Sequence, residues 1–207
     1  MEVSDSLFVG RLVKFTPLDP DQDAETESRW SHDAEYLRLL GPGMARPLPA
    51  ARMKKRYEDL EKAIDESRNQ FHFAIRLREP EREEGEDAGK PGKMGRMLGF
   101  VHINWISWNS GTANLSLGIG DPADRRKGYG SEALRMALRY VFAELNLHRL
   151  DAVVPAYNQT AQRLFERAGF VLEARHRQAL ARYGQRWDLL RFGILRDEWE
   201  QNLSQSR

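Results

Sequence analysis

The chain has 207 residues, a length that suits a single domain. Its hydrophobic residues (41%) can supply a core, and 32 Lys and Arg against 31 Asp and Glu leave a net charge of +1, which argues against a dedicated nucleic-acid binder because such proteins depend on a cationic surplus. The absence of cysteine excludes a disulfide framework, a thiolate zinc site and a cysteine nucleophile.

The first part of the chain predicts two strands with two helices between them. Residues 7–15 are typical of a strand, and a helix of about twenty residues is predicted near 24–40, where Gly41-Pro42-Gly43 ends it. A second helix is predicted near 50–67, because its apolar residues recur at steps of three or four. The alternation of apolar and polar residues in 71–77 predicts a half-buried strand.

Residues 78–93 differ in composition from their surroundings. Ten of these sixteen residues are charged, two are proline and three are glycine. Such a segment buries too little apolar surface to offset the entropy of ordering it, so we predict a mobile hairpin loop. We interpret it as a tolerated insertion rather than a functional element.

The second part predicts a mixed α and β order. Residues 97–106 and 113–120 are expected to form antiparallel strands across the turn at 109–111, and a helix with one broad apolar stripe begins near Gly130. The further predicted elements are a strand at 150–155, a helix at 159–168 and strands at 170–177 and 188–195.

The location of the protein follows from what the chain lacks. No apolar run is long enough to cross a bilayer, and the N-terminal residues 1–6 carry an early acid and no basic region of a secretory signal. We therefore expect a soluble, cytoplasmic protein, with residues 1–207 forming one domain, that binds neither membrane nor nucleic acid. We expect a monomer or a homodimer.

The most informative segment is the turn at 121–133, between a predicted strand and a predicted helix. Gly128 and Gly130 allow a sharp turn and let a ligand approach the backbone closely. The N–H groups that open the helix favour an anion, and three cations lie beside them. The arrangement suits a pyrophosphate. The three cations are Arg125, Arg126 and Lys127.

The spacing of this turn distinguishes it from other phosphate loops. It has neither the G-x-G-x-x-G of dinucleotide folds nor the G-x-x-x-x-G-K-[ST] of nucleotide triphosphatases. It reads R-x-x-G-x-G from Arg125 to Gly130, and here the chain resembles the GNAT superfamily, the Gcn5-related N-acetyltransferases, whose acetyl-CoA loop is Q/R-x-x-G-x-G/A. Residues 158–170 look like the second signature of that family, N-x-x-A-x-x-L-Y/F-E-K/R-x-G-F.

Other segments resemble the RimJ/RimL-like branch, namely residues 10–18, 146–150 and 188–199. The resemblance covers nearly the whole chain except 78–93, and it implies an α+β (mixed α/β) GNAT fold. In that fold a central mixed, mostly antiparallel sheet of about six to seven strands is flanked by helices and splayed between strands 4 and 5.

The resemblance also implies which residues hold acetyl-CoA. The fourth strand would bind the pantetheine arm, the turn would bind the pyrophosphate, Asn158 would hydrogen-bond the pantetheine, and Phe165 would line the thiol end or belong to the core. The implied cofactor-binding residues are Leu117, Gly118, Ile119, Arg125, Arg126, Lys127, Gly128, Tyr129, Gly130, Ser131, Asn158 and Phe165. No metal is implied.

The catalytic residues depart from the commoner family pattern. Phe165 stands where the acid is often a tyrosine, and Asn114 stands where a glutamate is common. Neither can transfer a proton, so the general acid and base stay unassigned. The candidates are Tyr157, Ser116, Glu173 and His102, the last of which is more simply a structural histidine.

The acceptor would be framed by two segments, 30–50 and 177–187. Asp33 and Glu35 could attract a cationic amine or simply face solvent. The last acceptor candidates are two tryptophans that could wall the cleft or belong to the core, Trp105 and Trp108.

The resemblance predicts an acetyl-CoA-dependent N-acetyltransferase whose acceptor is a primary amine of a protein N-terminus or a small molecule. Two alternatives stay open. One is an acyltransferase that uses another acyl-CoA or another acceptor. The other is a GNAT-like module that binds acyl-CoA without turnover.

Overall fold

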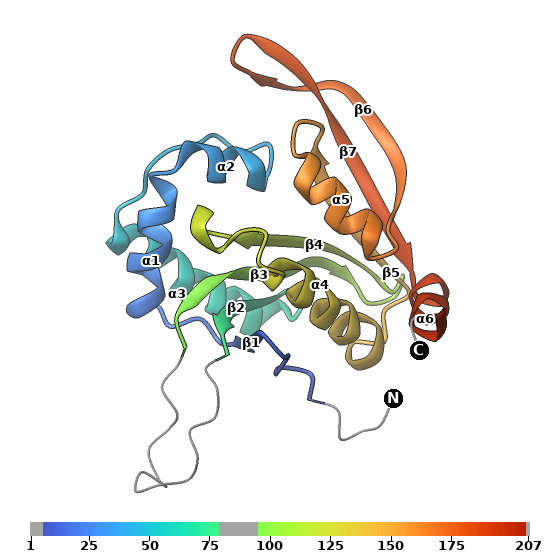
Figure 1. Cartoon of the computed structure of the whole chain (residues 1–207). Helices are drawn as coiled ribbons and strands as arrows, with labels where there is room; N and C mark the ends of the chain where they lie inside the picture. The colour runs from blue at the N-terminus through green and yellow to red at the C-terminus, as the bar shows by residue number, and fades with distance from the viewer. Residues whose placement is uncertain (1–5, 79–94, 206–207) are drawn as a thin grey trace, which may run out of the picture.

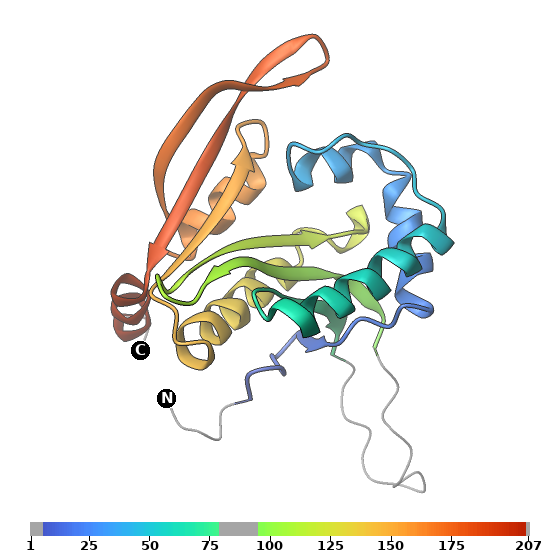
Figure 2. The ribbon, with the colours of Figure 1, turned by 180° about the vertical axis from the view of Figure 1, so that it is seen from behind.

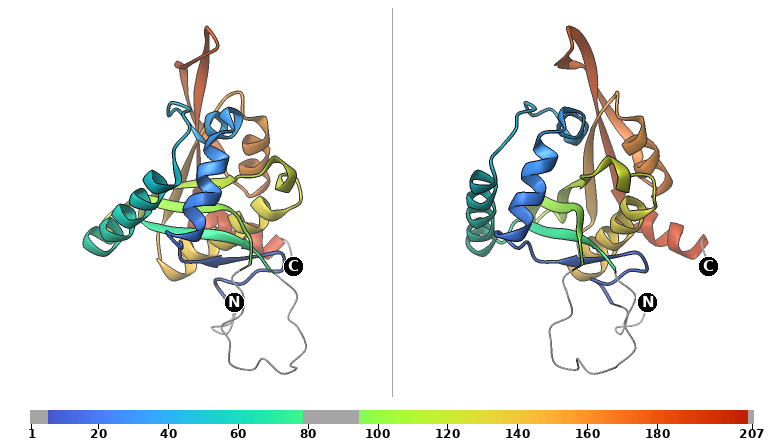
Figure 3. Two further views of the ribbon diagram at one scale, coloured as in Figure 1. Left: turned by 90° about the vertical axis from the view of Figure 1, so that its left-hand side faces the viewer. Right: turned by 60° about the vertical axis from the view of Figure 1, so that its left-hand side comes forward.

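A computed structural model describes residues 6–78 and 95–205. A seven-stranded sheet runs through the molecule, with α1 and α3 on one side and α4 and α5 on the other (Figure 3). The elements in chain order are β1 (Val13–Thr16), α1 (Gln22–Ser31), α2 (Ala34–Leu40), α3 (Ala50–Ser67), β2 (Phe71–Leu77), β3 (Met97–Ser107), β4 (Thr112–Ile119), η1 (Pro122–Asp124), α4 (Tyr129–Arg139), η2 (Tyr140–Glu144), β5 (Arg149–Pro155), α5 (Gln159–Arg167), β6 (Val171–Arg182), β7 (Gln185–Leu195) and α6 (Arg196–Gln205).

The strand order is β1-β2-β3-β4-β5-β7-β6, and only β4 and β5 run parallel. Their pairing joins Thr112–Leu115 to Arg149–Ala152 and then stops, although β4 continues to Ile119 and β5 to Pro155. The two strands therefore diverge beyond Leu115 (Figure 1). The mixed, mostly antiparallel sheet with a splay between its fourth and fifth strands is confirmed.

The core lies on both faces of the sheet. On one face α4 buries its apolar stripe, with Leu134 and Ala137 at 0% exposure. On the other face α1 and α3 cover a smaller cluster around Met53 and Tyr57. Each fully buried large side chain contributes about 1.5–3 kcal/mol relative to an exposed one, so both helix layers are held mainly by apolar burial.

Two predictions for the N-terminal part are wrong in extent. The helix predicted over 24–40 is two helices, because the Asp33 carboxylate accepts hydrogen bonds from the N–H groups of Glu35 and Tyr36 and starts a new helix there. The strand predicted over 7–15 is regular only from Val13, because the Glu132 carboxylate binds the backbone before it. Its oxygens accept from the N–H groups of Arg11, Leu12 and Val13 at 2.9, 2.6 and 2.8 Å.

The C-terminal part is more regular than the sequence indicates. The strands predicted at 170–177 and 188–195 are β6 and β7, which pair as far as Arg182 and Gln185 and project beyond the rest of the sheet (Figure 2). The predicted acceptor loop at 177–187 is therefore mostly strand. Helix α6 was not predicted, and the Glu198 carboxylate accepts from Leu195 N at its start (2.9 Å).

Two further predictions concern segments and properties that the fold tests only in part. Apart from Arg78, the predicted loop at 78–93 lies outside the described residues. Among the helices of residues 6–78 and 95–205, none is long and apolar enough to cross a membrane.

Candidate functional site

The splay leaves one edge of β4 without a strand partner. The N–H of Gly120 donates to Leu98 O on β3 (2.9 Å), so backbone groups of alternate residues, Leu117 and Ile119, point to the opposite edge, toward the gap. Because β5 pairs only as far as Ala152, it does not pair with them, and Ile119 O instead accepts a hydrogen bond from Arg125 Nε (3.3 Å). An extended ligand that contains amides can pair with such an edge as a strand would.

The turn before α4 presents a row of unused hydrogen-bond donors. Gly128 adopts φ 91° and Arg126 φ 64°, and the first bond of the helix is Glu132 N–H to Gly128 O at 3.0 Å. Within the described part of the chain, no backbone N–H of residues 126–131 donates a hydrogen bond, and no side chain caps α4. Consecutive free N–H groups at a helix start form an anion site.

The row of donors lies close to the residues of the open strand edge. A Cβ on Gly130 would stand 3.7 Å from the side chains of both Leu117 and Ile119. The site for an anion and the edge suited to an amide chain are therefore continuous.

The three predicted cations of the turn have different environments. Arg125 points inward and donates to Gly120 O (2.8 Å) and to the Asp33 carboxylate (3.3 Å). Lys127 lies 3.5 Å from Asp124, which also binds Arg96, and the hydrogen bond from Arg96 lowers the pKa of the Asp124 carboxyl. The side chain of Arg126 is exposed on the turn.

Helix α2 lies at the open end of the splay and is fixed at both of its ends (Figure 1). Its N-cap Asp33 binds Arg125, as described above. At its C-terminal end, Tyr157 Oη donates to Arg38 O (2.7 Å) and Asn158 Nδ2 donates to Leu39 O (3.0 Å). The Oδ1 atom of Asn158 meanwhile accepts from Ala161 N (3.0 Å) and caps α5. Both polar atoms of the Asn158 side chain are thus engaged.

Tyr36 on α2 was missed by the sequence analysis. Its side chain is 3% exposed, and its hydroxyl has no hydrogen-bond partner among the described residues. A Cβ on Gly118 would stand 3.5 Å from that hydroxyl, so α2 packs closely on the strand. Burial raises the pKa of the Tyr36 hydroxyl well above its ordinary value, which keeps it protonated. No spacing in the sequence indicates this contact.

Phe165 belongs to the core. It is 6% exposed and packs against Phe170 and Phe192, with ring centroids 5.0 and 6.2 Å away. Its position carries no group that could donate a proton to a leaving thiolate.

The other candidate acids and bases separate into two groups. Ser116 and Tyr157 lie at the open end, on β4 and just after β5. Glu173 does not: it forms an ion pair with Arg149, whose hydrogen bond lowers the pKa of the Glu173 carboxyl, near the paired end of β5.

His102 pairs across β3 and β4 with Ser116, but its ring is already satisfied. Nε2 lies 3.2 Å from Gln70 Oε1, and Nδ1 lies 3.4 Å from the Asn104 amide nitrogen. Burial, with a smaller contribution from Arg56, lowers the pKa of His102 to about 4. The ring is therefore neutral near pH 7 and has the character of a structural histidine.

The residues predicted to contact the acceptor do not all lie near the open end of the splay. The Asp33 carboxylate caps the N-terminus of α2 and accepts a hydrogen bond from Arg125, whereas Glu35 is exposed. Trp105 and Trp108 are 78% and 49% exposed at the β3–β4 turn, so neither is a core residue nor near the open end. The tryptophan beside the site is Trp30, whose ring stands where a Cβ of Gly120 would be.

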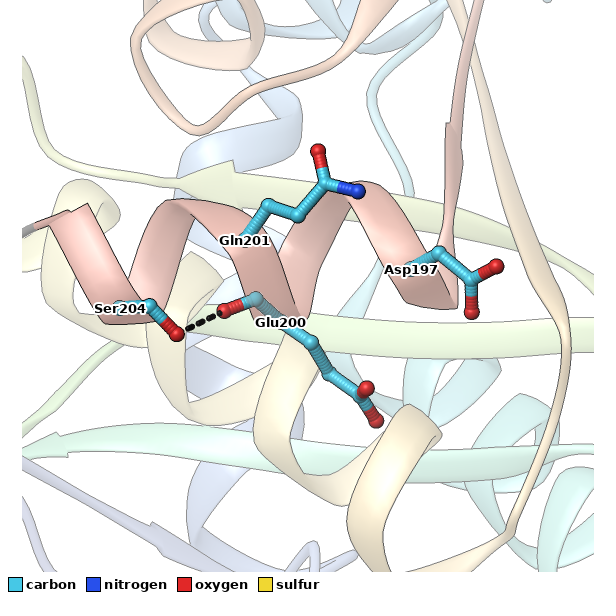
Figure 4. Close-up of a pocket in the computed structure, with 4 residues that line it drawn as sticks. All are labelled: Asp197, Glu200, Gln201 and Ser204. Carbon is cyan, nitrogen blue, oxygen red and sulfur yellow. Dashed lines mark hydrogen bonds between the residues drawn. The ribbon is translucent and has the colours of Figure 1, made fainter.

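A shallow depression also occurs on α6 (Figure 4). It is formed by four polar residues of this one helix, and Ser204 Oγ donates to Glu200 O at 3.0 Å within it. The helix follows the end of β7 that pairs with the start of β5, away from the splay. The depression is lined by Asp197, Glu200, Gln201 and Ser204. In the described ranges no three His, Asp or Glu side chains cluster in a way that could hold a metal ion.

An open strand edge beside a row of free N–H groups, within a splayed mixed sheet, suits a ligand that combines an amide chain with an anion. Residues 12–171 match the family described as the acetyltransferase (GNAT) domain. The chain belongs to this GNAT family, as the two motifs indicate.

Individual relatives agree with this membership. The SPbeta prophage-derived uncharacterized N-acetyltransferase YokL of Bacillus subtilis (strain 168) is 33% identical over 106 residues, which are 51% of this chain and 59% of YokL. The spermidine N(1)-acetyltransferase of Vibrio cholerae serotype O1 (strain ATCC 39315 / El Tor Inaba N16961) is 27% identical over 143 residues, 69% of this chain and 79% of that protein. The chain spans 59%, 48% and 32% of the length of three curated Bacillus subtilis relatives.

The fold is shared with solved structures. The crystal structure of spermidine N-acetyltransferase from Vibrio cholerae in complex with CoA and spermine superposes with a TM-score of 0.73 at 19% identity, over 92% of this chain and 99% of that one. At this identity the likeness concerns the fold.

Proposed function

We propose that this protein is an acetyl-CoA-dependent N-acetyltransferase, which transfers the acetyl group to a primary amine by direct attack. The observation that carries the proposal is the run of free N–H groups at residues 126–131 beside the open edge of β4. The family to which the chain belongs supports the reaction class.

In this proposal CoA lies along the splay. Its pyrophosphate binds the N–H groups of Arg126 to Ser131, including those of Gly128 and Gly130, and the exposed Arg126 side chain adds charge. Its pantetheine arm pairs with the backbone of Leu117 to Ile119. One N–H of Asn158 Nδ2 donates to Leu39 O, so a hydrogen bond from Asn158 to the arm uses the second N–H of the same amide.

The chemistry needs no covalent enzyme intermediate. The amine lone pair attacks the thioester carbon, the carbonyl electrons move to oxygen, and a strand N–H stabilises the charge that develops there. The C–S bond then breaks as C=O re-forms, and the amine proton is released to water or to the sulfur. A thiol has a pKa of about 8.5, so the thiolate leaves readily without an acid at Phe165.

The acceptor class is the open part of the proposal. A protein N-terminus, as in the RimJ/RimL-like branch, and a small-molecule amine both present the required nucleophile. The absence of titratable groups at Phe165 and Asn114 favours one second candidate, a module that binds acyl-CoA without turnover.

The experiment is thiol release from acetyl-CoA measured over a panel of amines, with calorimetric titration of CoA in parallel. Amine-dependent release supports the enzyme. CoA binding without release from acetyl-CoA or longer acyl-CoAs would favour the binding module, and the absence of CoA binding would reject both.

A further inference from the structure

Two arginines connect α2 to the tip of the β6–β7 hairpin. Nη2 of Arg182 donates to Pro42 O (2.7 Å) and Gly43 O (2.6 Å), just after α2. The Arg38 guanidinium lies 4.3 Å from the ring centroid of Tyr183 and also donates to its hydroxyl. The hairpin tip and the end of α2 are therefore in contact, at the end of the sheet where β4 and β5 diverge (Figures 1 and 2).

The same contact borders the proposed reaction site. The Tyr157 ring packs edge-on against Trp187 of β7, with centroids 5.4 Å apart, and its hydroxyl binds Arg38 O. Leu180 pairs with Trp187 and Arg182 with Gln185, so Arg182 lies on the Trp187 face of the hairpin because side chains alternate. Arg38 and Arg182 thus stand beside the aromatic pair at the open end.

The charges of these two arginines are not balanced by the described residues. Arg182 binds only carbonyl oxygens, those of Ala181, Pro42 and Gly43, and Arg38 binds only Tyr183. Glu35, one turn before Arg38, forms no ion pair with it. By contrast, other arginines face carboxylates, among them Arg76, Arg125 and Arg149.

The sequence around the tip strengthens this imbalance. Residues 174–187 contain four arginines and no acidic residue. A guanidinium has five N–H donors, of which Arg38 uses one in a hydrogen bond and Arg182 three. Both therefore keep donors for an external oxygen anion, and a planar guanidinium suits a carboxylate in particular.

We infer that the acceptor carries a carboxylate near its reactive amine, and that Arg38 and Arg182 bind this carboxylate. The inference rests on the proposed function and deepens it by naming the substrate class. A polyamine is disfavoured, because its additional positive charges would meet two unpaired guanidinium groups. An acidic peptide with a free N-terminus and a small amino dicarboxylic acid share the required chemistry.

The test compares four acceptors in the presence of acetyl-CoA. Two are short peptides, one with acidic residues at positions 2 and 3 and one in which those residues are replaced by the corresponding amides, Asn or Gln. The other two are free glutamate and spermidine. For the wild type we expect the kcat/KM of the acidic peptide to exceed that of the amide peptide about tenfold or more, with an advantage that shrinks at high salt. Comparison of the peptide with glutamate distinguishes the two sources of the carboxylate.

The variants distinguish a direct contact between the arginines and the carboxylate from a general electrostatic attraction by the positively charged hairpin. Arg182→Gln and Arg38→Gln should each lower kcat/KM for the carboxylate acceptor about tenfold and leave KM for acetyl-CoA within twofold. Arg186→Gln is the matched control, because Arg186 is exposed and lies on the opposite face of the same hairpin, on β7. Arg182→Glu should improve spermidine relative to the acidic peptide.

Two results would overturn the inference alone: a wild-type preference for spermidine or the amide peptide, or equal losses in Arg182→Gln and Arg186→Gln. No turnover with any amine would instead reject the proposed function, and this inference with it.

Discussion

Helices α4 and α5 begin on the two sides of the gap between β4 and β5, and they begin differently. The start of α5 is closed by its own Asn158, which caps Ala161 N and also binds Leu39 O. The start of α4 has no side-chain cap, and the N–H groups of 126–131 are unused within the described ranges. The start of α4 therefore keeps donors that an anion can bind, whereas Asn158 closes the start of α5 and holds it to α2.

The largest expected effect tests the α4 side. Gly128→Glu places a carboxylate among the donors at a residue with φ 91°, and we expect CoA affinity to fall at least about 100-fold, or about 2.7 kcal/mol. Gly184→Glu is the matched control, because Gly184 also has a positive φ (69°) but stands at the hairpin tip with nothing near its Cβ. Calorimetry on both folded variants gives the comparison. Unchanged affinity in Gly128→Glu would reject this placement of the pyrophosphate.

The next effect tests the α5 side. Asn158→Ala removes a helix cap and the bond to Leu39 O, each worth about 1 kcal/mol, so the melting temperature should fall by about 4–8 °C. CoA affinity should fall no more than about fivefold, because only the second N–H of Nδ2 is left for the ligand and one hydrogen bond contributes about 1 kcal/mol. A tenfold loss of CoA affinity at constant melting temperature would show instead that Asn158 leaves α2 to bind the pantetheine.

A smaller effect is expected from restoring the common tyrosine. Phe165→Tyr should change kcat by less than tenfold, about 1.4 kcal/mol, because a thiolate leaves without protonation. Tyr157→Phe provides the opposite test, since Tyr157 has a hydroxyl at the open end. Loss of turnover in Tyr157→Phe with intact CoA binding would identify Tyr157 as the acid and contradict this view of α5.

The smallest effect concerns pH. We expect turnover to rise with pH as the amine loses its proton and then to level off, without a descending limb below about pH 9. Burial keeps the pKa of His102 near 4, below its ordinary value, so this ring stays neutral across the profile. His102→Gln should leave the shape of the profile unchanged within twofold. A shifted ascending limb in kcat would make His102 the base.

The local sequence pattern was sufficient to predict those parts of the fold whose contacts are between residues close in sequence. The strand at 71–77 was predicted with its observed bounds, because alternation over seven residues is a property of those residues alone. The donors at 126–131 were predicted from Gly128 and Gly130 for a similar reason: a turn and the helix that follows it are adjacent in the chain.

The sequence by itself therefore determined the family, the sheet with its splay, and the turn with free N–H groups before α4. Only the tertiary structure decided what each charged residue near the turn does. Arg125 binds Asp33, 92 residues away, and Glu132 binds Arg11, 121 residues away. Arg182 meets Pro42 across 140 residues. No sequence spacing indicates such partners, because the packing of α2 and the hairpin brings them together only in the folded chain. Each polar side chain then forms a hydrogen bond with an unsatisfied group that the fold places beside it.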